Sequence, residues 1–168
     1  PICIMARSLN CEKGPTPTPC GTCQSCTDLV ANGPGSIDVI ELDAATHGLV
    51  DDARDLRDKA FFAPVQSKYK IYIIDEAHQL GPGAANALLK VVEEPPAHVI
   101  FIFATTEPEK LISTIRSRTH HYPFRFSTLG DHFHRHPDSI CSHNVCHRHW
   151  RRGWLMIMPA HGPHRHRR

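Results

Sequence analysis

Four cysteines near the start of the chain have the spacing of a metal site. Cys11, Cys20, Cys23 and Cys26 follow the pattern C-x8-C-x2-C-x2-C, and Gly21 lies between two of them. Overlapping C-x2-C steps let the thiolates converge on one ion, and a glycine permits the tight turn that this needs. The pattern predicts a closed structural zinc site, with a disulfide pair or a redox-active C-x-x-C pair as alternatives. Such a zinc ion would stabilise a loop and would not be catalytic, because no ligand position stays open.

Two adjacent carboxylates follow an apolar run in the middle of the chain. Residues 69–74 are rich in aromatic and β-branched side chains, and Asp75 and Glu76 come directly after them. A buried parallel strand would place both acids at the carboxyl edge of a sheet, where such sheets bind ligands. In a nucleotide-hydrolysing site the first acid holds Mg²⁺ and the second polarises the attacking water. The alternative is that the strand ends in Asp-Glu only because a loop begins there.

The elements that must position these residues alternate along residues 1–126. Residues 38–43, 69–74 and 99–104 have the composition of strands, whereas a helical spacing of apolar residues begins at Val50 and ends before Pro64. Further helices are expected at residues 84–93 and 109–115. Strands alternating with helices, with wholly apolar strands, predict an α/β fold: a parallel sheet covered by helices on both faces.

Length and composition limit the classes of protein that the chain can belong to. Its 168 residues suit one ordinary domain, and 40% hydrophobic with 21% charged residues allow a packed core and exclude global disorder. No run of 18 apolar residues occurs, which excludes a transmembrane helix, and the chain does not open with a signal-peptide pattern.

The composition changes near Phe126. Residues 1–126 carry 12 Lys and Arg against 15 Asp and Glu, a net charge of −3, whereas residues 127–168 carry seven Arg, no Lys and two Asp, a net charge of +5. This tail also has nine of the 14 His and both Trp, and residues 154–158 are its only apolar run. We expect it to be disordered. Three explanations of its composition compete: translation in a shifted reading frame, metal binding by its His and Cys, and binding of phosphate backbones by its Arg.

Several short motifs occur in a fixed order along the chain. They are Ala6–Cys11, the four-cysteine pattern, Ile73–His78, Asn86–Lys90, Glu93–Pro96, Ala104–Pro108 and Ile115–Arg118. Together they closely resemble the bacterial DNA polymerase III gamma/tau family, the AAA+ ATPase subunits of the replicative clamp loader. The resemblance covers about residues 4–126.

The resemblance implies roles for individual residues. Asp75 is expected to be the Walker B ligand of Mg²⁺, Glu76 the catalytic base, and Thr105 the sensor that contacts the γ-phosphate of ATP. Arg118 falls where the family has an arginine finger that reaches a neighbouring subunit, although Thr119 replaces the cysteine that follows it there. Taken alone, Thr105 could equally cap a turn at a strand end, and Arg118 could be a solvated surface residue.

The same resemblance implies an AAA+ core with an inserted zinc module at residues 11–26. Cys3 lies outside this module and has no metal role in the family. The expected function is ATP-driven loading of the sliding clamp onto primed DNA. The expected setting is a cytoplasmic hetero-oligomeric ring of clamp-loader subunits within DNA polymerase III, itself a nucleotidyltransferase. A non-hydrolysing scaffold of the delta-prime type and a zinc and nucleic-acid binding module are the alternatives. No phosphate loop G-x-x-x-x-G-K-[ST] occurs in the 168 residues, so the core is expected to be incomplete and to bind ATP poorly.

Overall fold

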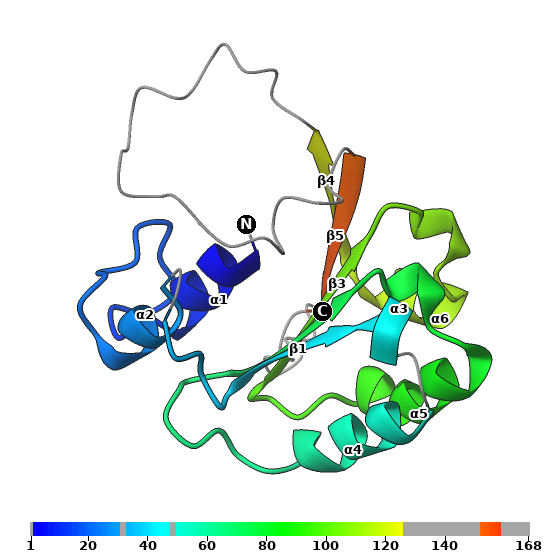
Figure 1. The fold of residues 1–168 in the computed structure, drawn as a ribbon, viewed down its shortest axis with the longest axis horizontal. Coiled ribbons are helices and arrows are strands. Elements are labelled where there is room, and N and C mark those ends of the chain that lie inside the picture. The colour runs from blue at the N-terminus through cyan, green and yellow to red at the C-terminus, as the bar shows by residue number, and fades with distance from the viewer. Residues whose placement is uncertain (1, 31–32, 48–49, 126–151, 159–168) are drawn as a thin grey trace, which may run out of the picture.

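The computed structural model describes residues 2–30, 33–47, 50–125 and 152–158 (Figure 1). In chain order the elements are α1 (Ile2–Asn10), α2 (Gln24–Asp28), β1 (Val39–Asp43), α3 (Ala44–His47), α4 (Val50–Ala60), β2 (Lys70–Asp75), η1 (Ala77–Gln79), α5 (Pro82–Glu93), β3 (Val99–Thr105), η2 (Pro108–Lys110), α6 (Ser113–Arg118), β4 (His120–Arg125) and β5 (Arg152–Met158). None of the helices in this described part of the chain is long and apolar enough to cross a bilayer.

The five strands form one sheet in the order β1-β2-β3-β5-β4. The first three are parallel, with Ile71 of β2 opposite Val39 of β1 and Ile100 of β3. Strand β5 runs antiparallel to both of its neighbours, so β4 points the same way as β1, β2 and β3. The predicted α/β fold with a parallel sheet is confirmed for β1 to β3.

The expectation of a disordered tail is wrong for Arg152–Met158, which form strand β5 between β3 and β4. This segment contains the one apolar run of the tail. Met156 is 0% exposed and Met158 is 3% exposed, because both pack into the core beside β3. Apolar burial together with backbone hydrogen bonds to two strands therefore outweighs the unfavourable composition around this run. The other residues predicted to be disordered lie outside the described part of the chain.

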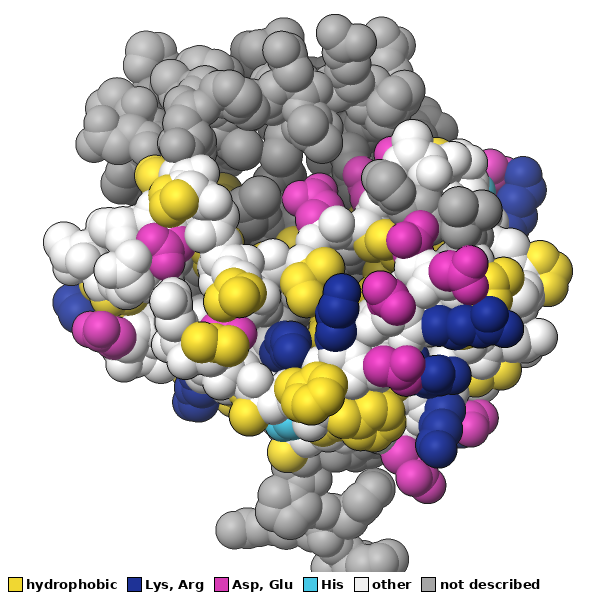
Figure 2. All heavy atoms as spheres, turned by 60° about the horizontal axis from the view of Figure 1, so that its bottom comes forward, with side chains coloured by type: hydrophobic (Ala, Val, Ile, Leu, Met, Phe, Trp, Pro, Cys, Tyr) yellow, Lys and Arg dark blue, Asp and Glu magenta, His cyan; other side chains and the backbone are white. Residues whose placement is uncertain are grey.

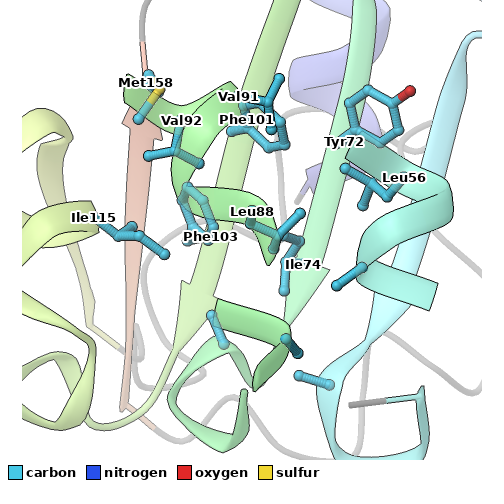
Figure 3. Packing of buried hydrophobic residues seen from close by; sticks show 14 of the residues in the cluster. Leu56, Tyr72, Ile74, Leu88, Val91, Val92, Phe101, Phe103, Ile115 and Met158 are labelled. Atoms are coloured by element: carbon cyan, nitrogen blue, oxygen red, sulfur yellow. The ribbon is translucent and has the colours of Figure 1, made fainter. Parts of the chain in front are cut away.

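Helices cover both faces of the sheet, as predicted (Figure 1). Strand side chains alternate between the faces: Tyr72, Phe101 and Phe103 stack on one another in a core shared with α4, α5 and α6. Figure 3 shows these side chains among Leu56, Leu88 and Ile115 of the helices. The opposite face packs against α1, and its buried residues are Ala6, Ile71, Ile73, Ile100, Ile102 and Ala104.

The predicted helices after Val50 and at residues 84–93 are confirmed as α4 and α5. The single helix expected over residues 109–115 is wrong, because a 3₁₀ turn ends at Lys110 and α6 begins only at Ser113. The residues between them have extended backbone, with ψ near 139° at Leu111 and 138° at Ile112. Extended backbone here lets Leu111 enter the core, where it is 4% exposed.

The segment between α4 and β2 exposes hydrophobic side chains although its backbone is anchored. Phe61, Phe62 and Val65 are 52%, 68% and 70% exposed. The buried Nζ of Lys70 donates to the carbonyl oxygens of Lys59 and Phe62, and His98 Nε2 lies 3.1 Å from the same Phe62 oxygen. Figure 2 shows hydrophobic side chains on this side of the molecule and, next to them, Lys and Arg interspersed with Asp and Glu.

Candidate functional site

The four cysteines predicted to bind a metal converge in the structure. The Sγ atoms of Cys11, Cys20, Cys23 and Cys26 all lie within 4.8 Å of one another, and those of Cys20 and Cys26 are 3.9 Å apart. An ion bound tetrahedrally at about 2.3 Å separates its sulfur ligands by about 3.8 Å, which matches this spacing. A disulfide holds its sulfurs at about 2.05 Å. All four side chains are free cysteines here, so the arrangement fits a metal ion better than the disulfide alternative.

The thiols of this cluster have unequal surroundings. Hydrogen bonds from the backbone N–H groups of Thr22 and Cys23 lower the pKa of Cys20 to about 5, so this thiol is ionised at neutral pH. Burial raises the pKa of Cys26 to about 12, so its thiolate needs a cation beside it. A bound cation supplies that charge, because a coordinating thiol is deprotonated on binding. The cluster therefore offers one ready anionic ligand and further ligands that a metal ion can ionise.

The cysteine cluster is tied to the sheet through Asn10 at the end of α1. Its Nδ2 donates to the carbonyl oxygen of Tyr69 at 3.0 Å, and its Oδ1 accepts the Tyr69 N–H at 2.9 Å. The amide of Asn10 thus pairs with the residue before β2 much as a neighbouring strand would. This pairing fixes the position of Cys11, the next residue, relative to the sheet.

The second predicted site lies at the carboxyl edge of the sheet. Asp75 is the last residue of β2, opposite Asp43 at the end of β1, and Thr105 is the last residue of the neighbouring strand β3. Because β2 and β3 are parallel, both strands deliver their terminal residues to the same edge. The structure therefore brings Asp75, Glu76 and Thr105 to one edge of the sheet.

Glu76 has a backbone conformation that non-glycine residues rarely adopt. Its φ of 47° and ψ of 42° lie in the left-handed region, and its N–H donates to Oδ1 of Asp75 at 3.0 Å. Its Oε2 is buried without a hydrogen-bond partner. A strained backbone and an unsatisfied carboxylate both cost stability, and such costs concentrate at functional sites.

His78 links the side chains at this edge. Its Nδ1 lies 2.9 Å from Oγ1 of Thr105 and 3.3 Å from Oε2 of Glu76. Thr105 is 2% exposed, and its Oγ1 also accepts the backbone N–H of Glu107 at 3.0 Å. The carboxylate of Glu107 faces Nε2 of His78 at 3.6 Å and contacts Nζ of Lys110 at 2.6 Å. The hydrogen bond from Lys110 lowers the pKa of Glu107, which therefore stays anionic at neutral pH.

Arg118 lies apart from this network, at the end of α6. Its Nη2 is 3.7 Å from Oε1 of Glu93, its Nη1 donates to the carbonyl oxygen of Thr114, and its side chain is 42% exposed. An exposed guanidinium next to one carboxylate contributes little to stability. Arg118 is therefore not part of the network at the sheet edge.

Sequence reasoning missed two residues of the network, His78 and Glu107. Both lie just after strands that the sequence located, two or three residues past the last strand residue. Adjacent parallel strands bring the segments after them together, so a histidine after one and a glutamate after the other was a usable signal.

Comparison with known proteins shows the family of the chain. The family model described as DNA polymerase III, delta subunit matches residues 2–128. The DNA polymerase III subunit gamma/tau of Mycobacterium tuberculosis H37Rv is 70% identical over 122 residues, which is 73% of this chain and 21% of that protein. The DNA polymerase III subunit tau of Bacillus subtilis is 53% identical over the same shares of the two chains.

A solved structure of a DNA polymerase III gamma subunit-related protein from Thermotoga maritima is 30% identical, with a TM-score of 0.47, and covers 55% of this chain and 32% of that one. The chain spans about a fifth of the length of the mycobacterial and Bacillus relatives. On the family match over residues 2–128, the chain belongs to the DNA polymerase III subunit family and resembles its gamma/tau members.

Proposed function

We propose that this chain is a segment of a DNA polymerase III clamp-loader subunit that takes part in DNA replication. The observation that carries the proposal is the meeting of Asp75, Glu76 and Thr105 at one edge of two adjacent parallel strands, in a chain of this family. In this proposal residues 1–126 are an incomplete AAA+ core for ATP and Mg²⁺, with a zinc module at residues 11–26.

Each residue at the sheet edge has a proposed role that fits its chemistry. Asp75 offers a carboxylate oxygen, the ligand type that Mg²⁺ prefers. Glu76 is the base that orients the attacking water, and Thr105 donates its hydroxyl hydrogen to the γ-phosphate. In the same proposal Arg118 reaches the ATP site of a neighbouring subunit, where a guanidinium stabilises charge on the transferred phosphoryl group. Its exposure at the end of α6 supports that role.

The wider cycle is part of the same proposal. It places the chain in the cytoplasm, in a hetero-oligomeric ring with other clamp-loader subunits that loads the sliding clamp onto primed DNA by using ATP. The four-cysteine cluster holds a structural zinc ion, which fixes the loop between α1 and α2 and takes no part in hydrolysis.

We further propose that residues 127–168 do not come from the clamp-loader family sequence, although Arg152–Met158 form strand β5 of the sheet. The end of the family match at residue 128 and the change of composition near Phe126 support this division. Sequencing the gene tests whether a shifted reading frame produced the tail: a one-base shift would then restore family sequence after Phe126. An intact frame that continues the tail would contradict that origin.

Paramagnetic Mn²⁺ in place of Mg²⁺ tests the proposed site at the sheet edge. The 168 residues lack the phosphate loop, so we expect weak binding and use Mn²⁺ with millimolar ATP and ¹⁵N-labelled protein. The amide signals of Asp75, Glu76 and Thr105 should broaden. Asp75→Asn should remove this broadening, because a neutral amide is a poor ligand for a hard cation.

The matched control is Asp51→Asn on α4, whose side chain is 91% exposed. This variant should keep the broadening of the wild type. Broadening centred on α4, or broadening at β2 that survives Asp75→Asn, would contradict the proposed site.

The non-hydrolysing scaffold is a second candidate function. It is favoured by the exposed Arg118 and by the family model described as the delta subunit. In a reconstituted clamp loader that contains this chain, the scaffold predicts that Arg118→Ala slows ATP hydrolysis by the neighbouring subunit while Asp75→Asn has no effect. The ATPase proposal predicts that both variants slow hydrolysis.

A further inference from the structure

One nitrogen atom of the His78 imidazole lies near a group that needs a hydrogen-bond donor and a group that needs an acceptor. Its Nδ1 is 2.9 Å from the Thr105 hydroxyl oxygen and 3.3 Å from Oε2 of Glu76. A ring nitrogen without a proton accepts a hydrogen bond, whereas one that carries a proton donates. The carboxylate of Glu76 can only accept, and the Thr105 hydroxyl needs an acceptor. These two side chains therefore compete for Nδ1.

The surrounding contacts favour the Thr105 hydroxyl over the Glu76 carboxylate as the hydrogen-bond partner of Nδ1. Oγ1 of Thr105 already accepts the Glu107 N–H at 3.0 Å and is buried, so its own hydrogen needs an acceptor within reach. Nδ1, 2.9 Å away, is that acceptor in the tautomer that carries the ring hydrogen on Nε2, facing Oε1 of Glu107. Glu76 is then left without a donor, and its Oε2 is indeed buried without a hydrogen bond.

We propose that His78 is a positioning residue that couples the Thr105 hydroxyl to the Glu76 carboxylate by exchanging its neutral tautomer. When a ligand oxygen accepts the Thr105 hydroxyl hydrogen, Nδ1 loses its donor. Nε2 then releases its proton to water, Nδ1 takes one up from water, and Nδ1–H donates to Oε2 of Glu76. The number of bound protons does not change. That the ligand is a phosphate rests on the function proposed above, whereas the competition for Nδ1 does not.

The tautomer exchange of His78 would orient the Glu76 carboxylate only under one condition. Glu76 has a strained backbone and a carboxylate oxygen without a hydrogen bond when Thr105 bonds to His78. After the exchange the same oxygen accepts a hydrogen bond, which fixes the orientation of the carboxylate. Glu76 is thus oriented only when Thr105 is engaged by a ligand.

The tautomer of His78 can be measured directly in the whole 168-residue chain. Long-range ¹H–¹⁵N NMR spectra at about pH 8, where histidine side chains are ordinarily neutral, separate protonated from unprotonated ring nitrogens. His78→Gln assigns the signals. In the wild type Nδ1 should be unprotonated and Nε2 protonated. In Thr105→Val, which keeps the shape but removes the hydroxyl, the two nitrogens should exchange their chemical shifts.

Two further variants separate this relay from a merely structural effect. Thr105→Ser retains the hydroxyl and should give the wild-type pattern. The double variant Thr105→Val with Glu76→Gln removes the carboxylate that draws the proton to Nδ1, and it should return to the Nε2–H form. His98 is an internal control: its Nε2 faces the carbonyl oxygens of Ala60 and Phe62, so it carries the hydrogen in every variant.

Three results would overturn the proposal. They are a protonated Nδ1 in the wild type, unchanged ring signals in Thr105→Val, and an exchange that persists in the double variant. The first is read from the unmodified protein and does not depend on the folding of any variant. Because no nucleotide is present in these spectra, the relay can fail or hold independently of the Mn²⁺ and ATP test of the proposed function.

Discussion

Oδ1 of Asp38 accepts the backbone N–H of Val65 at 2.8 Å, which joins the residue before β1 to the segment before β2. Oδ2 accepts the N–H groups of Gln66 and Ser67, also at 2.8 Å. The side chain is buried, with Asp38 0% exposed. Three N–H donors thus compensate one buried charge, and they hold the segment that presents Phe62 and Val65 to solvent.

Replacing this anchor should destabilise the fold. Asp38→Asn keeps the shape but turns an amide NH₂ towards backbone N–H groups, which leaves buried donors unpaired. Hydrogen bonds to charged groups contribute about 1.5–3 kcal/mol each, so we expect the free energy of unfolding to fall by about 2–3 kcal/mol. Urea unfolding at pH 7 measures the difference. Asp51→Asn, at an exposed position, is the control and should be neutral; an equal loss in both variants would contradict the anchor.

The same carboxylate predicts a pH dependence. Burial raises the pKa of Asp38, but the N–H groups of Val65, Gln66 and Ser67 together lower it more, so the net pKa lies below its usual value. Asp38 therefore contributes stability that is fully present above the unfolded pKa of about 3.9 and is lost as the pH falls through the lower folded pKa. The stability difference between wild type and Asp38→Asn should shrink below about pH 4. A difference that stays constant from pH 7 to pH 3 would exclude this linkage.

Metal content tests the cysteine cluster. The purified chain should release one equivalent of zinc from this site when its thiols are modified, and chelation should lower the thermal unfolding temperature, because metal binding contributes to folding. Cys26→Ser should lose that equivalent, since it removes a buried ligand. Cys3→Ser is the matched control and should keep it. Equal zinc release from both variants would place the metal elsewhere.

The hydrophobic pattern within a short segment was enough to predict individual strands and helices of the fold. The apolar run before Asp75 became β2, and the helical spacing after Val50 became α4. The residues of Arg152–Met158 were also recognised as an apolar run, yet their place between β3 and β4 was not predicted. Pairing across a long sequence separation depends on which sheet position is open, and a local pattern does not contain that information.

The candidate sites also differ in how far the sequence predicted them: local spacing was enough for some residues, whereas others depend on how the strands pair. Spacing alone predicted the convergence of the four cysteines, because they lie within 16 residues of one another. The end of an apolar strand predicted the place of Asp75 and Glu76 at the carboxyl edge of the sheet. The role of His78 depends on distances of 2.9 and 3.3 Å to two residues from different segments, and on the left-handed backbone of Glu76. Such contacts become visible only after the strands are paired.

Strand β5 contributes to the core through Met156, which is 0% exposed. Met156→Ala should lower the free energy of unfolding by about 2–5 kcal/mol, the usual cost of removing a large core side chain. Urea unfolding of the whole chain measures it. Val65→Ala, at a position 70% exposed, is the control and should change stability by less than about 0.5 kcal/mol. Equal stability of Met156→Ala and the wild type would show that β5 does not pack in solution.

Replacing Glu76 should make the fold more stable, although it would remove the carboxylate that the proposed function needs. Its φ of 47° is strained for any residue with a Cβ atom, and its buried Oε2 has no hydrogen bond. Glu76→Ala removes only the unsatisfied carboxylate, whereas Glu76→Gly also removes the backbone strain. Glycine should therefore raise the free energy of unfolding by about 1 kcal/mol relative to alanine, measured as a higher urea midpoint. Equal midpoints of the glycine and alanine variants would mean that the left-handed conformation is not strained. A higher midpoint in glycine would mean that the fold maintains this strain to keep a carboxylate beside Asp75 and His78.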